Sequence, residues 1–141
     1  MVLDADRPTQ MSDELFRIAT HVVFFERVSA RHQRSRRPRR RARRDGRRTP
    51  SFLAVTQGPR DVLWREGATL RQSPVFAVEA IDTLGAGDVF HGAFTLALAE
   101  GRDVVAALRF AAAAAGLKCT RLGGSMAAPH RTEVDALLAR S

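Results

Sequence analysis

The chain has 141 residues, enough for one domain with a core and short for two. A composition of 45% hydrophobic and 27% charged residues excludes wholesale disorder, and a single cysteine, Cys119, excludes an internal disulfide scaffold. The N-terminus has acids where a secretory signal needs basic residues, and no apolar run approaches the roughly 20 residues of a membrane span. We therefore expect a cytoplasmic protein without a membrane partner.

The net charge of +8 is concentrated in one segment. Between Glu26 and Arg48 the chain holds twelve arginines against Glu26 and Asp45, a net +10, so the rest of the chain carries −2. The basic character belongs to this segment alone.

In the N-terminal part, apolar runs predict strands. Residues 1–4 are expected to end a buried strand, and Ser12 is placed to cap a helix over 12–20. The run 21–25 and the run 51–56 are each typical of a strand that is covered on both faces.

The middle of the chain predicts a hairpin. Residues 61–66 and 68–72 flank the expected turn at Glu66 and Gly67. The apolar residues of 75–81 then predict one more strand.

Helical periodicity dominates the C-terminal part. Helices are expected over 88–99, from Asp103 through the alanine-rich run to Cys119, and over 132–140, the last capped by Thr132. The alternation of strands and helices predicts an α/β fold with helices on the faces of a sheet.

The sequence "DTLGAGD" places three small residues, Gly85 to Gly87, before Asp88 at an expected helix start. Unpaired helix amides and the helix dipole favour an anion there, and small residues let it come close. A carboxylate is a poor phosphate ligand, so Asp88 would be a general base for a hydroxyl that attacks a phosphoryl group. The alternative is a glycine-rich turn with Asp88 as an N-cap. Because Lys118 is the only lysine, this is no Walker P-loop.

The segment "DTLGAGDVFHGAF" resembles the C-terminal signature of the PfkB or ribokinase-like carbohydrate kinases. Two other segments support the resemblance: "VTQGPRDVLW" is similar to the family's nucleotide-binding turn, and "ALRFAAAAAGLKCTRLGG" to the helix and loop beside the adenine. The resemblance implies the C-terminal half of a three-layer α/β/α sandwich with an incomplete sheet. The segments "DADRP", "HVVF" and "AGLKC" look most like the ketohexokinase and fructokinase branch, which implies a ketose or related sugar as acceptor.

The resemblance also implies roles for individual residues. It makes Asp88 the catalytic base and assigns the anion hole to Gly85, Ala86 and Gly87. It assigns nucleotide binding to Thr56, Gly58 and Ala112. It implies a monovalent cation, K⁺, held by the carboxylate of Asp82 and by carbonyl groups of Leu84, Arg121 and Gly123. ATP with Mg²⁺ is the implied cofactor, and Asp61 departs from the family's usual glycine.

We expect one partial kinase domain in three parts: 1–25, the arginine-rich segment 26–49, and the nucleotide-binding and base-bearing part 50–141. Since the family holds its sugar largely with an N-terminal half, we expect weak or no sugar phosphorylation by this chain alone. The sequence leaves open whether the chain forms a homodimer.

Residues 27–48 contain only three apolar side chains, too few for a helix that covers a sheet. Three interpretations remain open: a nucleic-acid-binding arm on a degenerate kinase scaffold, a solvated insertion, and translation out of frame, which is favoured. Among single residues, His91 is expected to be partly exposed and Trp64 to pack in the interior. Glu26 is a candidate to lie near magnesium-bound water.

Overall fold

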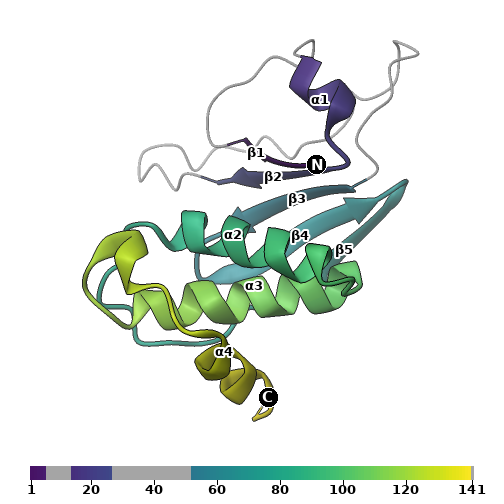
Figure 1. Cartoon of the computed structure of the whole chain (residues 1–141). Coiled ribbons are helices and arrows are strands. Elements are labelled where there is room, and N and C mark those ends of the chain that lie inside the picture. The colour runs from purple at the N-terminus through teal and green to yellow at the C-terminus, as the bar shows by residue number, and fades with distance from the viewer. Residues whose placement is uncertain (6–13, 27–51, 141) are drawn as a thin grey trace.

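A computed structural model of the chain describes residues 1–5, 14–26 and 52–140. Its strands are β1 Val2–Ala5, β2 His21–Phe25, β3 Phe52–Gln57, β4 Arg60–Glu66 and β5 Thr69–Ser73. Its helices are α1 Glu14–Ile18, α2 Ala86–Ala99, α3 Val104–Cys119, the short 3₁₀ helix η1 Gly124–Ala127, and α4 Arg131–Leu138 (Figure 1).

The five strands form one mixed sheet in the order β1-β2-β3-β4-β5. The pairs β1/β2 and β2/β3 are parallel, whereas β3/β4 and β4/β5 are antiparallel. Both Val22 and Val23 of β2 are fully buried, although successive side chains of a strand point to opposite faces. This strand is therefore covered on both faces, as its apolar run predicts.

The helices α2 and α3 pack against one face of the sheet, and α4 packs against α3 (Figure 1). Phe52 of β3 stacks on Phe94 of α2 at 5.7 Å between ring centroids, and Phe94 in turn stacks on Phe90. Trp64 is buried beside Phe52, as expected. The alanines of α3 from Ala111 to Ala114 are buried, and their short side chains let the helices and the sheet approach closely.

Four details differ from the expectations. Residues 75–81 form no strand: Phe76 and Val78 lie against Gly116 of α3, and the amides of Ile81 and Asp82 donate to the carbonyl of Cys119 rather than to a strand. Apolar periodicity there reflects packing on a helix.

The helix boundaries also shift. The cap of α4 is His130, whose amide donates to the Glu133 side chain at 2.7 Å, so Thr132 lies inside the helix. Glu66 belongs to β4, and the hairpin turn is Gly67 and Ala68. Of the helix expected over 12–20, the described residues form Glu14–Ile18, and Ser12 lies outside them.

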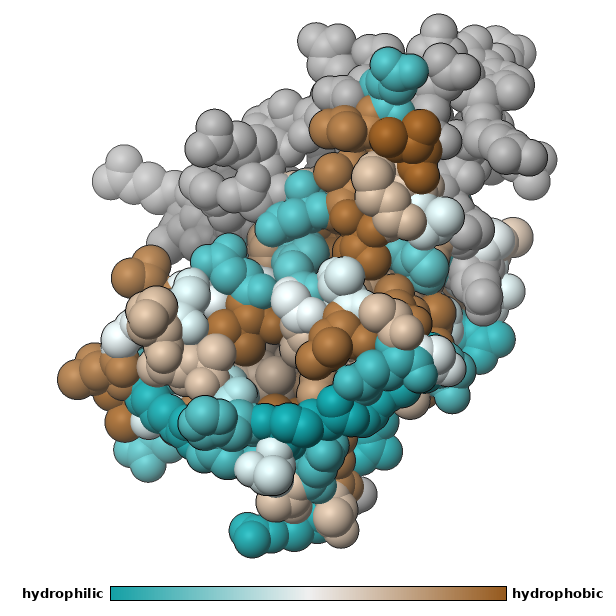
Figure 2. Space-filling model, viewed as in Figure 1, coloured by the Kyte–Doolittle hydropathy of each residue, from teal (hydrophilic) through white to brown (hydrophobic). Residues whose placement is uncertain are grey.

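Among the described residues, no helix has both the length and the apolar character needed to cross a bilayer. Figure 2 shows apolar and polar side chains interspersed over the described part of the face seen in Figure 1.

Candidate functional site

The site is built around the first turn of α2. Gly85 is the N-cap, with φ of 76°, a left-handed conformation that favours glycine. The amide of Ala86 donates to the carbonyl of Thr83. Within the described part of the chain, no oxygen accepts from the amides of Gly87 and Asp88, because a helix offers no acceptor to its first turn. The amide of Gly85 likewise has no acceptor there, so three amides remain for an anion.

Gly87 has no side chain because β2 leaves no room for one. A Cβ at this position would lie 2.6 Å from Cε1 and 3.0 Å from Cε2 of Phe25, and closer still to Cζ. Phe25 ends β2 and pairs with Thr56 of the parallel strand β3. The helix start therefore lies at the carboxyl edge of the parallel strands, where open α/β sheets usually bind their ligands.

Gly85 allows a second close approach, by the loop that leads into η1. A Cβ on Gly85 would lie 2.5 Å from the amide nitrogen of Ser125 and 3.0 Å from its Cα. The first two small residues of the motif thus have different roles. Glycine is required at position 85 by the positive φ and by the close approach of Ser125, whereas Ala86 has an ordinary helical conformation.

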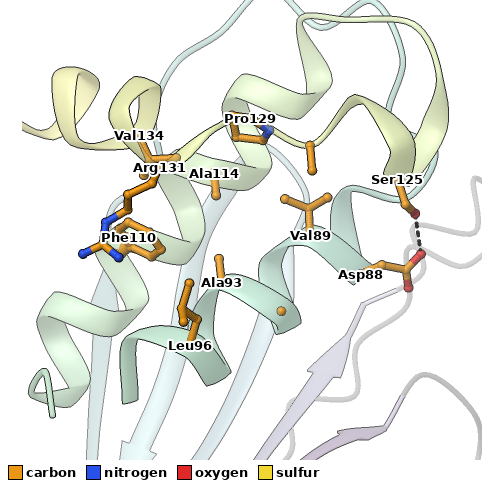
Figure 3. Close-up of a pocket in the computed structure, with 12 residues that line it drawn as sticks. Asp88, Val89, Ala93, Leu96, Phe110, Ala114, Ser125, Pro129, Arg131 and Val134 are labelled. Carbon is orange, nitrogen blue, oxygen red and sulfur yellow. Dashed lines mark hydrogen bonds between the residues drawn. The ribbon is translucent and has the colours of Figure 1, made fainter. Parts of the chain in front are cut away.

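Asp88 is an exposed residue at the third position of α2, not the N-cap. The interpretation of Asp88 as a capping residue is therefore wrong. Its Oδ2 accepts a hydrogen bond from the Ser125 hydroxyl at 2.9 Å (Figure 3). Among the described residues, its Oδ1 has no donor, so one carboxylate oxygen is available to a ligand hydroxyl.

A cavity of about 380 Å³ opens beside this carboxylate. Asp88 and Ser125 lie at one end and Phe110 and Arg131 at the other, with α2 and α3 between them (Figure 3). Most of the other lining side chains are small and apolar: Val89, Ala93, Leu96, Ala114, Ala128, Pro129 and Val134. The carboxylate thus borders an open volume rather than a packed interior.

Asp82 holds the loop against the helix start. Its Oδ1 accepts from the amide of Leu84 at 2.9 Å, and its Oδ2 accepts from the amides of Gly123 at 3.2 Å and Gly124 at 3.1 Å. The pKa of Asp82 lies well below its ordinary value, chiefly because of the Leu84 amide, then the Gly124 amide and Lys118. The carboxylate is charged at neutral pH and fastens two segments that are about 40 residues apart in the chain.

Lys118 is a functional candidate that the sequence pattern does not single out. Its ammonium is fully buried, donates to the main-chain carbonyl of Asp82 at 2.6 Å and lies 3.2 Å from Asp82 Oδ2. A lysine in an apolar helical run looks like a surface residue in sequence, and only the fold reveals that its head meets a carboxylate.

Two of the three residues whose carbonyl groups are expected to bind a monovalent cation lie beside Asp82. Leu84 and Gly123 lie beside Asp82, and the Leu84 carbonyl is close to Gly124. The side chain of Arg121 pairs with both carboxylate oxygens of Glu133, and the role expected of its carbonyl group stays a prediction.

The expected nucleotide-binding residues lie on separate elements. Thr56 is buried at the end of β3, where its hydroxyl donates to the Phe24 carbonyl at 3.4 Å. Gly58, with φ of 62°, forms the exposed turn between β3 and β4. Ala112 is buried on α3 and does not line the cavity described above. Thr56 pairs with Phe25 and therefore lies at the same edge of the sheet as the start of α2, whereas Ala112 lies on α3.

His91 is buried, contrary to the expectation of a partly exposed residue. Its Nδ1 contacts the Gly87 carbonyl at 3.1 Å, and its Nε2 lies 3.6 Å from Asp4 of β1. It is buried because α2 turns this face toward the parallel strands. Glu26 forms an ion pair with Arg60 at 2.8 Å and accepts from Gln57, so its carboxylate is already engaged.

Within the described ranges, no three His, Cys, Asp or Glu side chains converge on a metal position. The structure does not describe residues 27–51, which include most of the arginine-rich segment. The three interpretations of that segment therefore stay predictions.

Comparisons with known proteins point to one family. A family model described as pfkB family carbohydrate kinase matches residues 42–131. Ribokinase of Bacillus subtilis is 46% identical over 89 residues, which are 63% of this chain and 30% of that protein. The nucleic-acid-binding alternative finds no support among these relatives.

Solved structures are similar over longer stretches. Ribokinase from Thermotoga maritima has a TM-score of 0.73 at 29% identity, over 98% of this chain and 48% of that one. Arabidopsis thaliana ribokinase, solved with ribose and ATP, has a TM-score of 0.61 at 34% identity, over 64% and 30%. The chain spans about half the length of the first and about a third of the curated relatives. With the family model matching more than half of its residues and the fold agreeing, the chain belongs to the pfkB family of carbohydrate kinases.

Proposed function

We propose that this chain carries the nucleotide-binding and base-bearing part of an ATP-dependent carbohydrate kinase. One observation carries the proposal: the carboxyl side chain of Asp88 borders a cavity at a helix start where the amides of Gly87 and Asp88 have no acceptor within the described chain. An anion site and a base that sit side by side suit the transfer of a phosphoryl group to a hydroxyl.

In this mechanism the protein positions groups and supplies fixed charge. The amides of Gly87 and Asp88 and the positive end of the α2 dipole hold the transferred phosphoryl group. Asp88 takes the proton of the sugar hydroxyl on its free Oδ1, while Ser125 holds Oδ2 in place. Gly85 and Gly87 permit this geometry because any side chain would push the 123–125 loop or β2 away.

ATP is the phosphoryl donor that we propose, since the Arabidopsis relative is solved with ATP and ribose. Magnesium would come with ATP and would neutralise charge on its phosphates. Thr56 and Gly58, at the end of β3, are the residues that we propose beside the nucleotide, together with Ala112.

The sugar is less narrowly defined than the donor. Ribokinases predominate among the relatives, and a fructokinase from Xylella fastidiosa also matches at 31% identity with a TM-score of 0.60. The ketohexokinase and fructokinase branch expected from sequence therefore stays a prediction. Ribose, deoxyribose and fructose are the acceptors to compare first.

The test separates donor binding from transfer. ATP binding by the whole chain is measured calorimetrically, and phosphorylation of the three sugars is followed with radiolabelled ATP. We expect ATP binding with weak or no transfer. The chain spans half or less of the length of these relatives, and holding two substrates together supplies much of the rate of such reactions.

The decisive variant is Asp88→Asn, with Glu79→Gln as the matched control, since Glu79 is an exposed carboxylate that does not line the cavity. Asp88→Asn should keep ATP binding and lower any transfer by about 10²–10⁴-fold, the usual worth of a general base. A folded chain that binds no ATP, or transfer that survives Asp88→Asn unchanged, contradicts the proposal.

A further inference from the structure

The ion pair between Lys118 and Asp82 lies beneath the helix start. Lys118 is the only lysine of the chain, and its side chain has no exposed surface. A buried ammonium is costly unless a carboxylate and hydrogen-bond acceptors compensate its charge. Here the carboxylate and the main-chain carbonyl of one residue, Asp82, do both at 3.2 Å and 2.6 Å.

The same carboxylate is the one that family resemblance assigns to a monovalent cation. Its Oδ2 already accepts from two backbone amides and lies against the ammonium, and its Oδ1 accepts from the amide of Leu84. The negative charge of Asp82 is therefore matched before any ion arrives. A second cation at this place would be repelled by the ammonium only a few ångströms away. The residues present do not fit potassium.

The ion pair connects to the proposed base through three contacts. Lys118 fixes Asp82, Asp82 fixes the amides of Gly123 and Gly124, and the next residue, Ser125, donates to Asp88. Each contact joins segments that are far apart in the chain. A positive charge below Asp82 thus sets the position of the loop that holds the base.

We propose that the ammonium of Lys118 supplies, from within the chain, the positive charge that the family resemblance assigns to a bound monovalent cation. The loop 123–125 is then ordered without potassium. The part of this inference that concerns nucleotide binding rests on the proposed function. The part that concerns the ordering of the loop does not. Stability and nucleotide affinity of this chain are both independent of potassium.

The first experiment needs no activity. The Tm of the whole chain is measured in KCl, NaCl and choline chloride at equal ionic strength. The wild-type Tm is the same in all three salts. A rise specific to KCl, of a few degrees or more as expected for a ligand that binds only the folded state, would overturn the proposal.

Substitution of Lys118 gives the complementary result. Lys118→Ala leaves space beside an unpaired Asp82, so its Tm falls and then rises again in KCl or NH₄Cl but not in choline chloride. The control Arg140→Met removes one positive charge from an exposed position, and its Tm shows no such salt preference. If Lys118→Ala does not fold, the wild-type comparison still decides.

The second experiment measures ATP affinity of the wild-type chain in KCl and in choline chloride. We expect a difference below about fivefold, the lower end of the usual coupling between two binding sites. A larger gain in KCl overturns the proposal. Absence of ATP binding in both salts would instead refute the proposed function, and the Tm comparison alone would then judge the role of Lys118.

Discussion

The contact between Gly87 and Phe25 gives the sharpest test of the site geometry. In Gly87→Ala the new Cβ would lie 2.6 Å from Cε1 and 3.0 Å from Cε2 of Phe25, whereas ordinary carbon contacts are about 3.5–4.0 Å. The ring must retreat by roughly 1 Å, the difference between these separations. The ring also contacts His91 of the same helix, at 4.8 Å between ring centroids, and the Nδ1 of His91 lies 3.1 Å from the Gly87 carbonyl.

The matched control is Gly92→Ala on the same helix, where a Cβ meets no atom within 4 Å. Both substitutions gain helix propensity, up to about 1 kcal/mol. Only Gly87→Ala adds overpacking, which costs about 1–3 kcal/mol. The difference between the two variants therefore isolates the contact, at about 1–3 kcal/mol.

The assay is urea unfolding followed by the fluorescence of Trp64, the one tryptophan of the chain, which is buried beside Phe52. Gly92→Ala should be neutral or stabilising, and Gly87→Ala less stable than it by the stated amount. Combining Gly87→Ala with Phe25→Leu should recover part of the loss, because the two changes act on one contact. Equal stabilities of the two alanine variants would refute the close approach of α2 to β2.

The remaining predictions concern charge and accessibility. The Arg121 side chain, followed by the amide of His130, lowers the pKa of Glu133 from its ordinary 4.5. The ionised Glu133 carboxylate therefore stabilises the fold above pH 4.5, and this stabilisation is lost as the pH falls through the lowered pKa. Glu133→Gln should destabilise the chain at pH 7 but not in strong acid, and urea unfolding at the two pH values measures the difference. The protease Lys-C should leave the folded chain intact and cut only after Lys118 in urea, since that lysine has no exposed surface; cleavage without denaturant, read by mass spectrometry, would contradict its burial.

Sequence predicted those features whose causes are local. The strand at 21–25 follows from a run of apolar residues buried on both faces, and α3 begins where Asp103 can cap it, its carboxylate accepting from the Ala106 amide at 2.8 Å. The segment 75–81 has the same apolar character, but no strand of the described part of the chain pairs with it. Composition alone does not distinguish packing on a sheet from packing on a helix.

The site was predictable only as far as its motif extends. The small residues before Asp88 indicate an anion site because their effect on the helix start is local. Ser125 and Lys118 reach their partners across 37 and 36 residues of chain, so their contacts depend on how α3 and the following loop fold back. Side chains that act through tertiary contacts leave no periodic signal in one sequence.

The order of the strands bears on how the protein assembles. Strands β3 to β5 and the pair α2–α3 are joined by short connections, so their contacts close small loops and should form early. Strand β2 pairs with β3 at the edge of this unit, and β1 pairs with β2. A long stretch of chain separates each of these two strands from the next strand in sequence. Because Phe25 supplies the wall against which the first turn of α2 settles, the anion site should mature last, when the N-terminal strands dock on a preformed C-terminal unit.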